Sequence, residues 1–359
     1  MTVTARFEIN YHQILDEQSQ LVDALPSFAS DVDKLLQLYS AMVLTRTFDQ
    51  KAVALQRTGQ LGTYPSALGQ EAIAVAVGDA MRPEDVLIPY YREYGAHFLR
   101  GVTMTEMLLY WGGDERGMNF AVPRKDFPVC IPIASQGPHA IGVAFAMKLR
   151  KEARVAVVFF GDGSTSKGDF YESLNAAAAW DLPVVFIVNN NQWAISVPLA
   201  LQTRSQTLAQ KAIAAGFVGE QVDGNDILAM RERVGLAIEK ARAGQGPSLV
   251  EAISYRLSDH TTADDANRYR SAEEVAQHWK QEPIGRFQQF LLAQGFWDAA
   301  KQQKLMKETS QAVELAVQAY LDTPPQHPAS MFEYLYEKLP SAYKPQRKEL
   351  KGRHKHEPL

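Results

Sequence analysis

Two polar segments follow the two most apolar runs of the chain, and their residue types suit a hard metal ion. Asp162 comes directly after the apolar run 155–160, and Asn191 ends the polar segment that follows the apolar run 184–188. A carboxylate and an amide oxygen are ligands for Mg²⁺ or Ca²⁺ rather than for zinc or copper. Two side chains cannot fill the octahedral shell of Mg²⁺, which often shares its remaining positions with the phosphate oxygens of a ligand. The two residues therefore predict a metal site that also holds a phosphate.

The elements around these residues must bring them together. Neither apolar run alternates with polar residues, which is typical of strands buried on both faces of a parallel sheet. Helical spacing from Asp169 to about Trp180 separates the runs, so that strand, helix and strand form a βαβ unit. The carboxyl ends of parallel strands meet at one edge of the sheet, where open α/β sheets bind ligands. We expect Asp162 and Asn191 to share that edge.

The glycines beside the aspartate support a phosphate site. Gly161 and Gly163 let the main chain approach a ligand closely, and the amides near Ser164 and the next helix favour anionic groups. Two other phosphate motifs fit less well. The third glycine of the dinucleotide pattern is missing, and Asp169 stands where a P-loop requires lysine.

Composition excludes several classes of protein. The 359 residues are 46% hydrophobic and 22% charged, as in ordinary globular proteins. With 37 Lys and Arg against 41 Asp and Glu, the net charge of −4 provides no general field for nucleic acid or an anionic membrane. One cysteine, Cys130, excludes an internal disulfide and a cysteine-cluster metal site. No signal peptide or membrane-spanning run is found, so we expect a cytoplasmic protein without a membrane partner.

The chain is expected to contain three parts. Residues 1–34 form an N-terminal arm, residues 35–325 form the α/β domain with helices after it, and residues 326–359 form a tail. Basic residues gather in the tail, and they fit either a solvated terminus or a docking patch for an acidic partner.

Longer motifs resemble a known family. GDG at 161–163, followed by NN at 190–191, resembles the metal–diphosphate motif of thiamine-diphosphate enzymes. The segment GDGSTSKGDFYESLNAAAAWDLPVVFIVNNNQWAIS is similar to the alpha subunit of the first component of 2-oxo acid dehydrogenase complexes. The likeness continues, over residues 35–330, through GQLGTYPSALGQEA, IPYYREYG, IASQGPHAIGVAFAMKL and YRLSDHTTADDANRYR. It implies a thiamine-diphosphate-binding α/β fold, with a mostly parallel sheet, helices on both faces, a helical N-terminal arm and a C-terminal helical region.

The resemblance also implies how the metal and the diphosphate are held. It assigns Mg²⁺ to Asp162, Asn191 and the main-chain carbonyl of Trp193. It assigns the diphosphate of thiamine diphosphate to Tyr91 and Arg92, and the planar charged fork of an arginine suits a phosphate.

Further residues carry roles by the same resemblance. Gly163 and Ser164 match residues that line the diphosphate. Ile133, with Ile131 nearby, matches the bulky wedge that bends the thiamine. His260 matches a loop histidine that binds the diphosphate side and, as the catalytic residue of this chain, assists acyl transfer to a lipoyl group.

The implied function is that of the alpha subunit in a heterotetrameric enzyme. The resemblance implies thiamine-diphosphate-dependent oxidative decarboxylation of pyruvate, with transfer of the acetyl group to the lipoyl-bearing acyltransferase component. Thiamine catalysis also requires an α/β domain with a glutamate at the aminopyrimidine ring, and the chain is long enough for only one such domain. We therefore expect a separate beta subunit, an α₂β₂ assembly and no activity from this chain alone.

Several alternatives stay open. Within the family, branched-chain members are favoured by the segments PIASQGPHA and SDHTTADDANRYR. Many members have a histidine in the segment that reads GGDERGMNF here, and this chain has none there. Asn189 stands where the family commonly has Glu or Arg. A branched-chain 2-oxo acid dehydrogenase and an acetoin dehydrogenase are therefore alternatives. Outside the family, a nicotinamide-dependent dehydrogenase is disfavoured by the missing glycine pattern. A subunit that only supports a partner is disfavoured because it requires none of Asp162, Asn191, Arg92 and His260.

Overall fold

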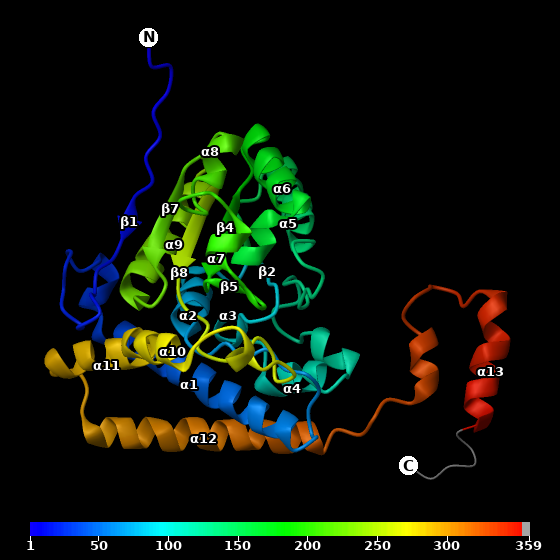
Figure 1. Cartoon of the computed structure of the whole chain (residues 1–359). Coiled ribbons are helices and arrows are strands. Elements are labelled where there is room, and N and C mark those ends of the chain that lie inside the picture. Colours follow the sequence, from blue (N-terminus) through cyan, green and yellow to red (C-terminus); the bar gives the residue numbers. More distant parts are fainter. Residues whose placement is uncertain (354–359) are drawn as a thin grey trace. The chain divides into compact units, whose positions relative to one another are not determined.

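The computed structural model describes residues 1–353 (Figure 1). The chain divides into two compact units, a large one of residues 1–317 and a small one that begins at residue 318. The strands all lie in the large unit among the described residues. The boundaries that the sequence predicts at 34/35 and 325/326 stay predictions, and residues 354–359 of the predicted tail lie outside the described residues.

The described residues form one six-stranded and one two-stranded sheet together with helices. The strands of the larger sheet are β1 Tyr11–His12, β2 Val86–Ile88, β3 Ala156–Gly161, β4 Val184–Asn190, β7 Gly219–Asp223 and β8 Ser248–Ile253. The strands of the smaller sheet are β5 Trp193–Ala194 and β6 Val197–Pro198. The α-helices are α1 Val32–Arg57, α2 Glu71–Ala80, α3 Tyr94–Leu99, α4 Met104–Trp111, α5 Gln136–Leu149, α6 Gly168–Ala179, α7 Leu199–Gln202, α8 Lys211–Ala215, α9 Ile227–Arg242, α10 Ala272–His278, α11 Pro283–Ala293, α12 Ala299–Leu321 and α13 Lys344–Arg353.

The larger sheet is parallel throughout, in the order β1-β7-β8-β4-β3-β2. The predicted βαβ unit is confirmed, because α6 connects β3 to β4 and the two strands pair with Gly161 opposite Asn189. β4 is longer than the apolar run indicates. It continues through Asn190, which lies opposite Ile253 of β8, so pairing with a second neighbour extends the strand into the polar segment.

Helices cover both faces of the sheet, as the sequence predicts. Val157 and Phe159 of β3 pack on the face covered by α2 and α9, with α1 and α11 behind these helices. The alternate residues Val158 and Phe160 pack on the opposite face, against α5, α6 and α8 (Figure 1). Because successive side chains of a strand point to opposite faces, a strand that is covered on both sides must be apolar throughout.

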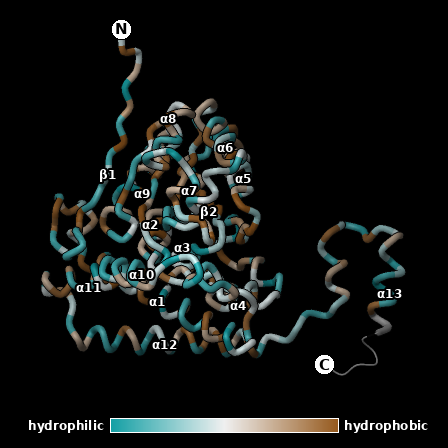
Figure 2. Tube along the Cα trace, in the orientation of Figure 1, coloured by the Kyte–Doolittle hydropathy of each residue, from teal (hydrophilic) through white to brown (hydrophobic). Residues whose placement is uncertain are grey.

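The longest C-terminal helix is amphipathic rather than apolar. α12 runs beside α1 (Figure 1), and hydrophobic and hydrophilic residues alternate along it (Figure 2). Its buried side chains recur every fourth residue, as expected for one face of a helix: Leu305, Thr309, Val313 and Val317. Among residues 1–353, no helix combines the length and the apolar character that crossing a membrane requires.

A buried carboxylate joins the N-terminal segment to the sheet. Asp226 caps α9 by accepting hydrogen bonds from the main-chain N–H groups of Leu228 and Ala229, at 3.0 and 3.2 Å. Its other oxygen accepts from the N–H groups of Ile14 and Leu15, at 2.6 and 2.7 Å. Burial raises the pKa of Asp226 to about 6. One side chain thus begins a helix and fixes the segment that continues from β1.

Removal of this carboxylate tests its role. Asp226→Ala leaves four buried N–H groups without their acceptor, and we expect a loss of about 3 kcal/mol in the free energy of unfolding, measured by urea titration. Asp31→Ala is the matched control, because Asp31 caps α1 through a single bond at the surface, and we expect it to lose about 1 kcal/mol. Equal losses in the two variants would contradict the account.

Candidate active site

A cavity of about 200 Å³ lies at the carboxyl ends of β3 and β4. The sequence predicts ten site residues, and all of them except Ile131 line this cavity. The lining residues are Tyr90, Tyr91, Arg92, Ile133, Gly161, Asp162, Gly163, Ser164, Asn191, Trp193, Ala194, Ile195 and His260. Ile131 is 48% exposed and is not among the lining residues, although its neighbour Ile133 is. The lining residues come from five separate segments of the chain, of which the pairing of β3 with β4 brings together 161–164 and 191–195.

Asp162 presents a buried carboxylate at the end of β3. It is 2% exposed and begins the 3₁₀ turn Asp162–Ser166. Its Oδ2 accepts a hydrogen bond of 2.6 Å from the amide of Gln202, which the sequence analysis did not identify. Burial raises the pKa of Asp162. A cation beside this carboxylate would offset that effect by stabilising its charged form.

A network of amides fixes the orientation of Asn191. Its Nδ2 donates a hydrogen bond of 3.0 Å to Oε1 of Gln70, and Nδ2 of Asn189 donates to the same oxygen at 2.9 Å. Because the nitrogen of Asn191 faces Gln70, its Oδ1 lies on the other side, where it accepts from the N–H of Trp193 at 3.2 Å. Asn189, which also accepts from the hydroxyl of Ser254, is used inside the protein and does not line the cavity.

The main-chain carbonyl of Trp193 already has one partner. Nη1 of Arg256 donates to it at 3.2 Å, and Nη2 donates to the carbonyl of Ile195 at 2.8 Å and to the hydroxyl of Tyr269 at 2.9 Å. A carbonyl oxygen has two lone pairs, so one remains for a second partner. Burial and the nearby Arg92 lower the pKa of Arg256. Arg256 lies in the same quoted motif as His260, and that proximity was the only signal for it in the sequence.

Arg92 is buried and held by main-chain oxygens. It donates to the carbonyl of Ser66 and, at 2.8 Å, to the carbonyl of His260. Ser66 is in turn fixed by Asp49 of α1, whose Oδ2 accepts from the Ser66 hydroxyl at 2.5 Å. The guanidinium also lies over the ring of Tyr91, 5.2 Å from its centroid. α1 thus positions a buried positive charge at the cavity.

The tautomer of His260 follows from its neighbours. Nδ1 lies 3.1 Å from Nη2 of Arg92. A guanidinium can only donate, so Nδ1 accepts and the proton of the neutral ring lies on Nε2. Burial, together with Arg92 and Arg256, lowers the pKa of His260 to about 3. At neutral pH the ring is therefore uncharged and has an N–H donor.

The composition of the cavity fits an anion together with a hard cation. The guanidinium group of Arg92 and the carboxylate of Asp162 both line the cavity, and the buried guanidinium group of Arg256 lies behind it, bonded to the carbonyls of the lining residues Trp193 and Ile195. The hydroxyl of Tyr90 is buried at the cavity and has no hydrogen-bond partner among the described residues. A Cβ atom on Gly163 would lie 2.7 Å from Cβ of Ala194, so the close approach of these segments requires glycine. Carboxylate, amide and carbonyl oxygens are the donors that Mg²⁺ selects.

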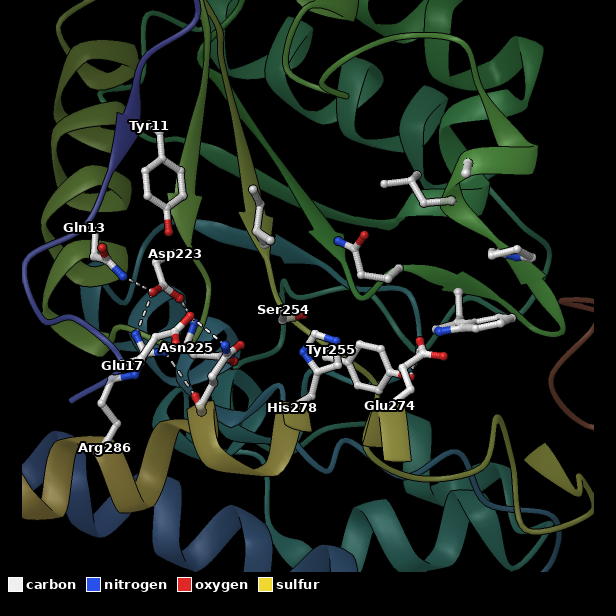
Figure 3. A pocket seen from close by; sticks show the side chains of 17 residues that line it. Tyr11, Gln13, Glu17, Asp223, Asn225, Ser254, Tyr255, Glu274, His278 and Arg286 are labelled. Atoms are coloured by element: carbon white, nitrogen blue, oxygen red, sulfur yellow. Dashed lines mark hydrogen bonds and ion pairs between the residues drawn. The ribbon is translucent and has the colours of Figure 1, made fainter. Parts of the chain in front are cut away.

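A larger cavity, of about 510 Å³, lies at the ends of β7 and β8 beside the N-terminal segment (Figure 3). Its central charges are already paired, because Nη1 of Arg286 lies 2.6 Å from Oδ2 of Asp223 and Gln13 donates to the same oxygen at 2.8 Å. This network attaches α11 and the N-terminal segment to the sheet, and it leaves no excess of positive charge for an anion. The smaller cavity is therefore the candidate active site.

Comparisons with known proteins identify the family of the chain. Residues 39–329 match the family model described as "Dehydrogenase E1 component". The chain is 39% identical over 331 residues to the "Pyruvate dehydrogenase E1 component subunit alpha" of Staphylococcus aureus (strain Mu50 / ATCC 700699), an alignment that covers 91% of this chain and 89% of the relative. It is 38% identical over 349 residues to the "3-methyl-2-oxobutanoate dehydrogenase subunit alpha" of Mycobacterium tuberculosis (strain CDC 1551 / Oshkosh), which covers 97% and 91%.

The family match spans the cavity and all the residues that line it, and both relatives extend over most of the chain. The chain belongs to the dehydrogenase E1 component family.

Proposed function

We propose that this chain is the alpha subunit of a thiamine-diphosphate-dependent 2-oxo acid dehydrogenase that acts on pyruvate. The observation that carries the proposal is the meeting of Asp162 and Asn191 at one sheet edge, beside the buried guanidinium groups of Arg92 and Arg256. This arrangement supplies hard oxygen ligands and positive charge in one place, as a magnesium diphosphate requires. Membership of the family supports thiamine diphosphate as the cofactor.

The residues divide into a metal group and a diphosphate group. Mg²⁺ is held by the Asp162 carboxylate, by Oδ1 of Asn191 and by the carbonyl of Trp193. Arg92 and Tyr91, with the main chain at Gly163, bind the diphosphate. When bound, thiamine diphosphate supplies the ring that accepts the electron pair released as CO₂ leaves a 2-oxo acid. The chain itself fixes the position of this cofactor and neutralises its negative charge.

His260 acts in the later transfer of the acetyl group to a lipoyl group of the acyltransferase component. Burial, together with Arg92 and Arg256, lowers the pKa of His260 and keeps the ring neutral, and the Arg92 guanidinium keeps its proton on Nε2. A neutral imidazole with a fixed N–H can donate a hydrogen bond to a sulfur or oxygen atom of the incoming acceptor. The main-chain N–H of His260 donates to Asp264 at 2.8 Å, which fixes the loop that presents the ring.

A second candidate substrate is 3-methyl-2-oxobutanoate. The relative from Mycobacterium tuberculosis is named for that substrate and is almost as similar to this chain as the relative named for pyruvate. Ile133 and Ile195, two apolar residues that line the cavity, are compatible with either substrate.

A beta subunit completes the active site in this proposal. The described residues contain one six-stranded α/β sheet, and thiamine catalysis requires a second α/β domain that contacts the aminopyrimidine ring. Ile133, Ile195 and Val197 expose 45%, 55% and 41% of their surface at or next to the cavity. Exposed apolar side chains grouped around a site are typical of a surface that a partner covers. The proposed assembly is α₂β₂.

Loss of the proposed metal ligand tests the cofactor site. Asp162→Asn keeps the side-chain volume but removes the negative charge, and we expect the affinity for thiamine diphosphate with Mg²⁺ to fall by about 100-fold or more. Isothermal titration calorimetry of the cofactor-free complex with the beta subunit measures this change. Asp169→Asn is the control, because Asp169 lies on α6 and does not line the cavity. Binding that is indifferent to Asp162→Asn, or to chelation of the metal, would refute the proposed site.

Reconstitution tests the partner and the substrate. The purified chain alone is expected to release no CO₂ from pyruvate, because one wall of the active site is missing. Co-expression with the beta subunit is expected to restore turnover, followed by reduction of a dye, with pyruvate preferred over 3-methyl-2-oxobutanoate and over acetoin. Full turnover by the isolated chain would contradict the requirement for a beta subunit. A preference for another substrate would contradict the assignment of pyruvate.

Separate assays of the two half-reactions test His260. We expect His260→Ala to slow acetyl transfer to a lipoylated domain by about 100-fold or more, the usual cost of removing a positioned hydrogen-bond donor. Dye reduction at saturating cofactor is expected to change much less, since it bypasses the lipoyl group. His278→Ala, at the larger cavity, is the control. Equal losses in both assays of the His260 variant would show that the residue serves only cofactor binding.

A further inference from the structure

The hydroxyl of Tyr90, at the cavity, forms no hydrogen bond with the described residues. Tyr90 lines the cavity and is 4% exposed, yet its hydroxyl has no hydrogen-bond partner among the described residues. Buried hydroxyls that lack a partner are uncommon, because their transfer from water is not compensated. Two neighbouring tyrosines show the ordinary case. The hydroxyl of Tyr64 donates to Asp49 at 3.0 Å, and that of Tyr94 donates to the carbonyl of Pro65 at 2.9 Å.

The position of Tyr90 is fixed by bonds that do not involve its hydroxyl. Its main-chain N–H donates to Oε2 of Glu93 at 3.0 Å, and its carbonyl accepts from the N–H of Cys130 at 2.7 Å. The ring packs edge-to-face on Tyr91, with centroids 4.4 Å apart. A Cβ atom on Gly161 would lie 4.0 Å from Cε2 of Tyr90. The ring is therefore held beside the end of β3, where Asp162 begins.

The hydroxyl of Tyr90 can donate a hydrogen bond, and none of the described residues accepts it. Burial and the nearby Glu93 raise the pKa of Tyr90 well above its ordinary value, so the group keeps its proton. Arg92, two residues further along the chain, offers only donors through its guanidinium group. No described residue accepts a hydrogen bond from the Tyr90 hydroxyl, which leaves it available to a ligand in the cavity. The positive charge of Arg92 and Arg256 makes an anionic oxygen the favoured acceptor.

We propose that Tyr90 is a further cofactor-binding residue, whose hydroxyl donates a hydrogen bond to an oxygen of the bound diphosphate. The inference rests on the proposed function and adds a residue that neither the sequence motif nor the family resemblance singled out. In the absence of the cofactor, the buried hydroxyl has no hydrogen bond and therefore lowers the free energy of unfolding. In its presence the same group gains a charged acceptor, and hydrogen bonds to charged groups are the stronger class.

The hydroxyl is expected to lower the stability of the cofactor-free protein and to raise its affinity for the cofactor, and these two effects can be measured separately. Tyr90→Phe removes one oxygen atom and leaves the ring in place. In the complex with the beta subunit, we expect the dissociation constant for thiamine diphosphate with saturating Mg²⁺ to rise about tenfold or more, by isothermal titration calorimetry. Inorganic pyrophosphate with Mg²⁺ should weaken by a similar factor, because the lost bond is to the diphosphate. The melting temperature of the cofactor-free complex is expected to stay the same or to rise.

Tyr39→Phe is the matched control. Tyr39 is also buried, but its hydroxyl donates to Gln302 at 2.8 Å, away from the cavity. We expect this variant to lower the melting temperature of the cofactor-free complex and to leave the affinity for thiamine diphosphate unchanged. The pair of variants therefore separates a hydroxyl used by the ligand from one used by the fold.

Three results would overturn the proposal. An unchanged dissociation constant in Tyr90→Phe would mean that solvent satisfies the hydroxyl in both states. A lower melting temperature of the cofactor-free complex would mean a structural role. Weakened binding of thiamine diphosphate with unchanged binding of pyrophosphate would move the contact to another part of the cofactor. If the wild-type complex binds neither ligand, the proposed function fails as well, and that outcome is visible before any variant is made.

Discussion

The parallel pairing of β3 with β4 is the constraint on which the site depends. It sets Gly161 opposite Asn189, and the residues that follow in each segment reach the same cavity. The buried guanidinium groups of Arg92 and Arg256 are bonded mainly to carbonyl oxygens and have no ion pair within the described part of the chain. Burial of charge without a counter-ion is unfavourable, so the fold maintains a positive cavity that an anionic ligand stabilises.

The parts of this arrangement that could be predicted are those that a continuous pattern encodes. Unbroken apolar runs indicated β3 and β4, helical spacing indicated α6, and the residues just after each strand followed from strand direction alone. The length of β4 could not be predicted, because Asn190 joins the strand only through its pairing with β8. β1 was missed for a similar reason. It is two residues long, and it exists because β7 offers an edge and Asp226 holds the segment that follows.

Supporting residues left no comparable signal in the sequence. Gln70 and Gln202 are isolated polar residues, and their bonds to Asn191 and Asp162 span long separations along the chain. Tyr90 also left no signal, because the sequence does not show which tyrosine hydroxyls have a hydrogen-bond partner inside the protein. The resemblance to the family identified the residues that would touch the ligand, whereas the structure was required to find those that orient them. Ile131 marks the limit of such transfer, because only its neighbour Ile133 lines the cavity.

The central claim is that one metal ion is shared by the ends of the two strands and by a diphosphate. A crystal structure of the complex with the beta subunit, grown with thiamine diphosphate and Mn²⁺ in place of Mg²⁺, tests it most directly through the anomalous signal of the metal. The account predicts one peak in each alpha subunit, within about 2.0–2.3 Å of an Asp162 oxygen, of Oδ1 of Asn191 and of the Trp193 carbonyl. A peak elsewhere, or Asp162 and Asn191 oxygens too far apart to share one ion, would contradict it.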